Sequence, residues 1–282
     1  MPPKDLQERT RLIEISRLER GESSRLQDRL AVEEPLEIRL IYGPDRERVE
    51  QSISITMRTP GHDRELALGF LHGEGILHDF EHEVVRAGPR TDKPTCNVVL
   101  VELQPRVEFN ASHLQRNFYT TSSCGICSKA SLEALSMTGC TTLRSIRQSF
   151  SSRLIYGLPD QLRAVQSIFA ETGGLHAAAL FDEAGNLLCL GEDVGRHNAV
   201  DKVVGVQFEA GRIPLHNCLL MVSGRTSFEI LQKALMAGIP TVAAVSAPSS
   251  LAVETAHQYG MTLIGFLRGQ RFNIYTHPGR VI

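Results

Sequence analysis

The sequence contains one Cys-x-x-Cys pair, Cys124 and Cys127, within residues 118–129 (FYTTSSCGICSK). Small and hydroxyl-bearing residues flank the pair and predict a surface loop, and a helical stretch follows at residues 130–137. The positive end of a helix lowers the pKa of a nearby thiol and raises the fraction of nucleophilic thiolate. Residues 110–159 contain five basic residues and one acidic residue, Glu133, which gives this segment a net charge of +4. We therefore predict a reactive thiolate in this segment.

Several chemistries use such a pair. Structural zinc requires about four ligands, and the chain has no second Cys-x-x-Cys. His72 and Glu74 resemble the His-x-Glu half of a zinc deaminase, but Ser123 stands where that signature has proline, so we expect no metal. Disulfide exchange stays open, and so does inert packing of two buried thiols. Besides metal binding and disulfide exchange, such a pair can carry sulfur. In sulfur carriage, a thiolate takes up a sulfane sulfur as a persulfide and a second cysteine assists its release.

Two segments that follow predicted strands are candidates for binding phosphate. Residues 223–227 (SGRTS) combine a glycine turn with the start of a helix, and Arg225 could reinforce an anion site there. Residues 191–202 (GEDVGRHNAVDK) place Arg196 and His197 among six charged or imidazole side chains. This pattern permits acid–base chemistry, a phosphate clamp or a dense salt-bridge cap. An ordinary capped helix is the alternative for residues 223–227.

The third candidate is a basic segment near the end of the chain. No acidic residue follows Glu254, and the remainder carries a net charge of +3. Residues 266–271 come just after a predicted strand, where open α/β sheets bind ligands, and two arginines beside a glutamine suit a phosphorylated nucleotide. A basic surface hairpin is the alternative. The candidate cofactor-binding residues here are Phe266, Leu267, Arg268, Gly269, Gln270 and Arg271.

The elements that position these residues follow from hydrophobic periodicity. Residues 1–30 carry 13 charges and predict a frayed or weakly helical charged arm. Alternating residues at 36–42 and 52–58 predict a hairpin. A helix is expected at 65–73, with further strands at 96–103 and 106–109. We divide the chain into the arm (1–30), a smaller β-rich domain (31–117), the Cys-x-x-Cys loop with its helix (118–154) and an α/β domain (155–282).

The second domain alternates strands and helices, which is typical of a three-layer α/β sandwich around a mixed sheet. The overall class is α/β, or α+β when the first domain is included. The predicted helices are 158–171, 196–210, 227–237 and 249–259, and the predicted strands are 175–181, 186–190, 218–222, 241–245 and 262–266.

The composition of the chain limits which classes of protein and which partners are compatible with the sequence. The chain has 282 residues, of which 42% are hydrophobic, enough for a substantial core. A net charge of −2 indicates neither a nucleic-acid-binding protein nor a protein with an acidic tail. The N-terminus lacks the apolar region of an export signal, and no apolar run approaches the length of a membrane span. We expect a cytoplasmic protein with reduced cysteines and neither nucleic acid nor membrane as partner.

The sequence resembles the FdhD/NarQ family, the formate dehydrogenase accessory sulfurtransferases. Four stretches carry the match, and the likeness spans roughly residues 33–277. A weaker fifth match joins residues 59–61 (TPG) to residues 69–75 (GFLHGEG). Ser128 departs from the glycine expected in many relatives. The four stretches are residues 121–127 (TSSCGIC), 191–202, 223–227 and 266–275 (FLRGQRFNIY).

The resemblance implies a sulfur carrier. Cys124 would accept sulfur from a cysteine desulfurase as a persulfide, with Cys127 as its partner. The acceptor would be the molybdenum cofactor, Mo-bis(molybdopterin guanine dinucleotide), before its insertion into formate dehydrogenase. Residues 266–271 would bind this cofactor, and a guanine nucleotide such as GDP would occupy the same site. The family also implies a cytidine-deaminase-like second domain and a homodimer. A cofactor-binding chaperone without sulfur chemistry and a dithiol oxidoreductase are the alternatives.

Overall fold

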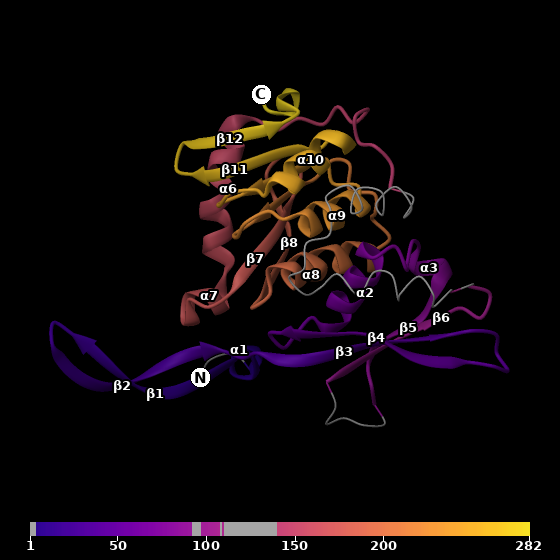
Figure 1. Cartoon of the computed structure of the whole chain (residues 1–282), viewed down its shortest axis with the longest axis horizontal. Helices are drawn as coiled ribbons and strands as arrows, with labels where there is room; N and C mark the ends of the chain where they lie inside the picture. The colour runs from indigo at the N-terminus through magenta and orange to yellow at the C-terminus, as the bar shows by residue number, and fades with distance from the viewer. Residues whose placement is uncertain (1–3, 92–96, 108, 110–139) are drawn as a thin grey trace.

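The computed structural model describes residues 4–91, 97–107, 109 and 140–282. Two sheets of different size form the body, and a two-stranded ribbon projects from it (Figure 1). The smaller sheet lies in the N-terminal half and the larger one in the C-terminal half.

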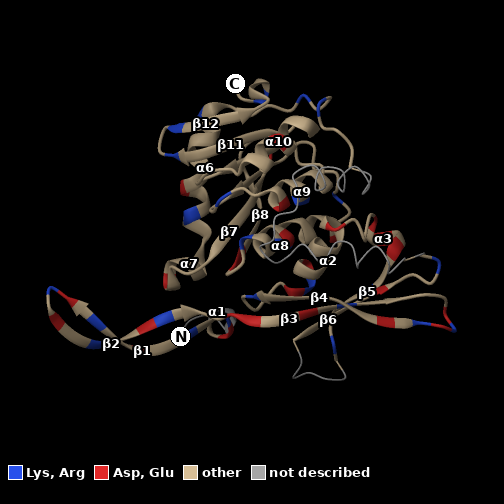
Figure 2. Ribbon diagram, viewed as in Figure 1, with Lys and Arg blue, Asp and Glu red and all other residues tan. Residues whose placement is uncertain are grey.

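The N-terminal arm is a β-hairpin that follows a short helix, α1 (Lys4–Arg9). Strands β1 (Thr10–Glu19) and β2 (Glu22–Ala31) pair antiparallel over their full length. Arg20 and Gly21 join them with φ angles of 52° and 89°, the left-handed geometry of a tight hairpin turn. The prediction of a frayed or weakly helical segment is therefore wrong. Charged residues are frequent along the ribbon, as the composition indicates, and they lie within the paired strands (Figure 2).

The four-stranded sheet has the order β4-β3-β6-β5. The predicted hairpin is confirmed as β3 (Glu34–Tyr42) paired with β4 (Val49–Arg58). The helix at 65–73 is α2 (Asp63–Gly73), and the strand at 96–103 is β6 (Val98–Leu103). The prediction missed β5 (Val84–Pro89) and the short α3 (Phe80–Glu83). A strand at 106–109 is wrong in its described part, because the N–H of Val107 bonds back to Gln104 in a turn.

The six-stranded sheet has the order β12-β11-β10-β9-β7-β8 and mixes parallel with antiparallel pairs. The elements predicted in this half are present, with the helix predicted at 158–171 divided into α6 and α7 and an additional strand β12 at the sheet edge. The strands are β7 (His176–Phe181), β8 (Leu187–Asp193), β9 (Leu219–Val222), β10 (Thr241–Ala244), β11 (Thr262–Arg268) and β12 (Arg271–Thr276). The helices are α6 (Ser152–Val165), α7 (Ser167–Thr172), α8 (Arg196–Glu209), α9 (Phe228–Met236) and α10 (Ser250–Tyr259).

Helices cover both faces of this sheet, so the predicted three-layer arrangement is confirmed (Figure 1). Alternate residues of each central strand enter different cores, as the pleat requires. Leu220 and Val242 pack with side chains of α8, α9 and α10. Met221 and Ala243 pack on the opposite face with side chains of α6.

The two halves meet where α2 crosses α8. The backbones touch at two glycines, one on each helix. A Cβ atom on Gly69 would overlap the carbonyl oxygen of Asp201, and one on Gly205 would overlap that of Glu65. Only glycine allows this approach, so the α2–α8 crossing fixes the position of one half on the other.

The crossing predicts a large effect of a single methyl group. Gly69→Ala should lower the free energy of unfolding by about 3 kcal/mol, because the methyl group meets rigid backbone. Gly157→Ala is the matched control inside α6. A Cβ atom on Gly157 would lie 3.8 Å from the amide nitrogen of the flexible Gln161 side chain. It should leave stability unchanged or raise it by about 0.5–1 kcal/mol through helix propensity. Urea denaturation measures both, and a Gly69→Ala protein as stable as wild type would contradict the crossing.

Candidate functional site

One edge of the six-stranded sheet gathers all the phosphate-binding candidates. Strands β9, β10 and β11 are parallel, so their carboxyl ends lie at the same edge. Strand β7 runs antiparallel to both β8 and β9, which brings the start of β7 and the end of β8 to that edge as well. We call this set the carboxyl edge, and it consists of His176 and residues 193–197, 223–227, 245–249 and 266–271.

Backbone hydrogen bonds link neighbouring loops along the carboxyl edge. The N–H of Thr226 donates to the carbonyl oxygen of Ala247 (3.2 Å), and the N–H of Ser249 donates to that of Thr226 (2.9 Å). The next loop is joined by the N–H of Phe266, which donates to Ser246 (3.1 Å). The segments that are far apart in sequence thus form one continuous row.

Residues 266–271 form a hairpin turn at one end of this row. Strand β11 extends to Arg268, which pairs with Arg271 at the start of β12, and Gly269 has a φ of 53°. Phe266 also has a positive φ, 54°, and the Arg268 guanidinium lies 5.9 Å from the centre of its ring. Basic residues mark this turn in Figure 2.

The side chains of this turn are not equivalent. Arg268, Gly269, Gln270 and Arg271 are exposed and available to a ligand. Leu267 is fully buried in the core between the sheet and α6, so its side chain serves packing, and only its backbone could contact a ligand.

The motif at residues 191–202 is mainly a structural junction. Asp193 and Lys202, which are 0% and 1% exposed, form an ion pair of 2.8 Å. Lys202 also donates to the carbonyl oxygens of Thr59 (3.0 Å) and Glu192 (3.2 Å), and Asp193 accepts from the N–H of Thr59 (3.1 Å). Burial lowers the pKa of Lys202, and the charge of Asp193 opposes this shift. Because Thr59 belongs to the N-terminal half, these bonds join the two halves.

Other side chains of the motif are also satisfied inside the protein. Asn198 donates to Asp193 (3.0 Å) and to the carbonyl oxygen of Met57 (2.8 Å). The Glu192 carboxylate accepts the N–H groups of residues 168 and 169 at the start of α7 (3.3 and 3.0 Å). Asp201 forms a buried ion pair with Lys233 of α9 (2.7 Å). Of the six charged or imidazole side chains, only Arg196 and His197 are left for the carboxyl edge.

Arg196 and His197 begin α8 beside the loop at 223–227. Nε2 of His197 lies 2.6 Å from a carboxylate oxygen of Glu229 and 3.2 Å from Oγ of Ser227. The hydrogen bond from His197 holds the pKa of Glu229 below its usual value. Arg225 is exposed on the same loop. The sequence analysis missed one member of this group, His176, because a lone histidine at the start of a strand gives no signal.

The cysteine chemistry centres on residues that lie outside the described part of the chain, Cys124 and Cys127. Three other cysteines are described. Cys140 has its sulfur 3.0 Å from that of Met236, and Cys189 and Cys218 lie within the core region. Burial raises the pKa of the Cys189 thiol, and burial together with nearby negative charge raises that of Cys218 to about 11. Neither Cys189 nor Cys218 has the environment of a nucleophile.

His72, the residue that imitates a zinc ligand, serves packing. Its two ring nitrogens lie 2.9 Å and 3.1 Å from the carbonyl oxygens of Leu77 and Met236. Among the described residues, no group of three or more His, Cys, Asp or Glu side chains is arranged to hold a metal ion.

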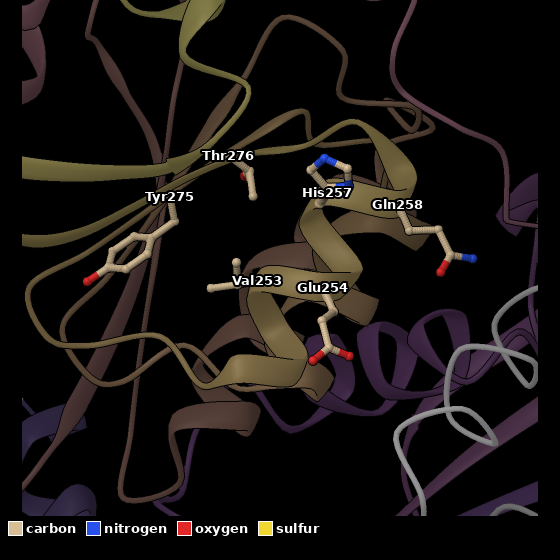
Figure 3. Close-up of a pocket in the computed structure, with 6 residues that line it drawn as sticks. All are labelled: Val253, Glu254, His257, Gln258, Tyr275 and Thr276. Atoms are coloured by element: carbon tan, nitrogen blue, oxygen red, sulfur yellow. The ribbon is translucent and has the colours of Figure 1, made fainter.

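A separate surface pocket of about 440 Å³ lies between α10 and β12 (Figure 3). No residue of the predicted site lines it, and α10 shows no unusual pattern in the sequence. The lining residues are Val253, Glu254, His257, Gln258, Tyr275 and Thr276. No described helix is long and apolar enough to cross a membrane.

The raised pKa predicts that Cys218 resists alkylation in the folded protein. At pH 8 its thiolate fraction should be about 100-fold below that of an ordinary thiol, and burial slows the reaction further. Mass spectrometry after a short iodoacetamide pulse, compared with the urea-unfolded protein, measures the protection. Equal labelling rates of Cys218 in both states would contradict the described environment.

The comparisons with known proteins agree with this architecture. The sequence profile of the FdhD/NarQ family matches residues 31–282. The sulfur carrier protein FdhD of Streptomyces avermitilis is 50% identical over 272 residues, covering 95% of this chain and 94% of the relative. That of Mycobacterium tuberculosis is 50% identical over 259 residues, covering 89% and 91%. A crystal structure of a putative formate dehydrogenase accessory protein from Desulfotalea psychrophila shares the fold, with a TM-score of 0.74 at 23% identity, covering 97% of this chain and 99% of that one. The chain belongs to the FdhD/NarQ family.

Proposed function

We propose that this protein is a sulfurtransferase that carries sulfur as a persulfide on Cys124 and delivers it to the molybdenum cofactor of formate dehydrogenase. The observation that carries this proposal is the 50% identity, over 95% of the chain, to relatives named sulfur carrier protein FdhD. The Cys-x-x-Cys pair lies within the family match at residues 31–282.

The loading step needs no external oxidant. The Cys124 thiolate attacks the terminal sulfur of a persulfide on a cysteine desulfurase. The new sulfur–sulfur bond forms on Cys124 as the bond on the desulfurase breaks, and the desulfurase cysteine leaves as a thiolate. The terminal sulfur keeps its oxidation state throughout. A low thiol pKa, expected from the basic segment around Cys124, favours this attack.

The delivery step assigns a role to Cys127. Its thiolate attacks Sγ of the Cys124 persulfide, a Cys124–Cys127 disulfide forms, and the terminal sulfur leaves as hydrosulfide for the acceptor. The two electrons that reduce this sulfur come from the two thiols. A cellular dithiol reductant then restores the pair.

The carboxyl edge is the proposed binding site for the acceptor, Mo-bis(molybdopterin guanine dinucleotide), a guanine-bearing polyanion. The exposed side chains at 268–271 suit a phosphorylated guanine nucleotide such as GDP, and Arg225, Arg196 and His197 continue the row of polar groups that could contact phosphate. Phe266 and Leu267 shape the turn that presents these groups. The expected partners are the desulfurase, formate dehydrogenase and a second copy of this chain, in the cytoplasm.

Replacement of the proposed nucleophile tests the function. Incubation with desulfurase and cysteine should add one sulfur atom, about 32 Da, to wild-type protein and none to Cys124→Ala. Cys189→Ala is the matched control, because that thiol is poorly ionised. It should load as wild type does, and intact-protein and peptide mass spectrometry measure both.

Three outcomes would contradict the assignment. Loading of Cys124→Ala at the wild-type level would place the persulfide elsewhere. A stable Cys124–Cys127 disulfide without sulfane sulfur would favour a dithiol oxidoreductase. Formate dehydrogenase activity that persists with Cys124→Ala, together with intact cofactor binding, would favour a cofactor-binding chaperone.

A further inference from the structure

The β1–β2 ribbon projects from the body and carries an apolar stripe on one face (Figure 1). Ile13, Ile15 and Leu26 lie half-buried in this stripe, and Leu30 is 43% exposed. None of the three hydrophobic cores among the described residues includes them. We call this side of the ribbon the outer face. It consists of Arg11, Ile13, Ile15, Arg17 and Glu19 on β1 and Glu22, Ser24, Leu26, Asp28 and Leu30 on β2.

The opposite face holds the base of the ribbon on the body. The guanidinium of Arg29 lies 3.4 Å from the carboxylate of Glu171 in α7 and donates to the hydroxyl of Thr10 (3.0 Å). The Cβ atom of Ala31 would lie 3.9 Å from a Cβ atom on Gly174. Because successive side chains of a strand point to opposite faces, the outer face points away from these contacts.

The exposed stripe needs an explanation that sulfur transfer does not give. A two-stranded ribbon is at best marginally stable in water, and an apolar face gains stability only when another surface covers it. The sequence profile of the family begins at residue 31, so the residues that define the family do not include the ribbon. The ribbon is therefore a feature with a role of its own.

The charges of the outer face have opposite signs on the two sides of its centre. Ile15 and Leu26 form the central pair of residues. Arg11 lies four residues from Ile15 toward the base of the ribbon, and Glu19 lies four residues from it toward the tip. Glu19 is directly opposite Glu22, and like charges in this position are unfavourable. Within the described part of the chain, neither carboxylate has an ion-pair partner.

We propose that the outer faces of two copies of this chain pack against each other, with the ribbons antiparallel and a two-fold axis at Ile15 and Leu26. The apolar centre of each ribbon then covers the apolar centre of the other. Arg11 of each copy lies at the level of Glu19 and Glu22 of the other copy. The unfavourable pair of carboxylates thereby receives a cation.

A second pair of charges obeys the same symmetry. Asp28 lies on the base side of the centre, and Arg17 lies at the same distance on the tip side. In the antiparallel arrangement, Asp28 of one copy is at the level of Arg17 of the other. Tip-to-tip packing would instead bring Arg11 to Arg11 and Glu19 to Glu19, so the charges select the antiparallel arrangement.

The size of the outer face predicts a weak and reversible contact. Ten residues per strand make a ribbon about 34 Å long, and two strands are about 10 Å wide. The contact therefore offers about 340 Å² per copy, whereas a stable complex buries about 800 Å² per partner. The proposal goes beyond the proposed function and shares with it only the expectation that a second copy is a partner.

Cross-linking tests which face makes the contact. Ile15→Cys introduces a thiol at the proposed axis, and Ser16→Cys introduces the matched control thiol on the opposite face. A short bis-maleimide should link the two introduced thiols of Ile15→Cys, and peptide mass spectrometry locates the link. Ser16→Cys should give no more cross-linked dimer than wild type. Equal cross-linking of both variants, or none with Ile15→Cys, would overturn the proposal.

Charge reversal tests the arrangement of the two ribbons. Arg11→Glu should weaken self-association about 10-fold or more in sedimentation velocity, because both symmetric contacts become repulsive. Adding Glu19→Arg to this variant should restore association to within about 3-fold of wild type. Arg25→Glu, the same change on the opposite face, is the matched control and should associate as wild type does.

Three results would overturn the contact: a wild-type protein that is monomeric at every concentration, equal weakening by Arg11→Glu and Arg25→Glu, or no recovery in the doubly changed variant. Sulfur transfer is tested separately. Cys124→Ala should self-associate as wild type does, and Arg11→Glu should still load sulfur on Cys124. Failure of the ribbon contact is therefore distinguishable from failure of the sulfur carrier.

Discussion

The buried ion pair between Asp193 and Lys202 is the interaction on which the rest of the structure depends. Two charges removed from water are stable only when their remaining hydrogen-bonding capacity is used, and here the backbone of Thr59 supplies both a donor and an acceptor. The N-terminal half is therefore required to complete the C-terminal half. The glycine contact between α2 and α8 places the two halves at the distance these bonds need.

This junction also explains the shape of the carboxyl edge. Asp193 ends β8 and Lys202 lies within α8, so their pairing fixes the start of that helix against the sheet. Arg196 lies on the first turn, where its own charge is unfavourable. The same motif therefore supplies the internal ion pair and places Arg196 and His197 at the carboxyl edge.

Local patterns predicted most of the second half, because short apolar strands alternate there with helices and turn residues separate them. Local patterns failed where the bonding partners of a residue lie far away in the sequence, and where a strand is mostly exposed to solvent. The arm pairs with itself around Arg20 and Gly21, and its many charges hid the strands. Spacing within residues 191–202 could not show which charges are internal, since Thr59 and Lys233 come from elsewhere in the chain. For the same reason Leu267 could not be recognised as a core residue. The roles of Cys124 and Cys127 stay predictions from the sequence.

A double-mutant cycle on the buried pair tests the central claim most directly. The free energy of unfolding is measured in urea for Asp193→Asn, Lys202→Met and the double variant. Each single change should lower it by about 3–5 kcal/mol, because one partner is left buried and unpaired. The double variant should be more stable than the sum predicts, with a coupling energy of about 2 kcal/mol or more. Additive effects, with no coupling, would show that the two buried charges do not stabilise each other and would contradict this account.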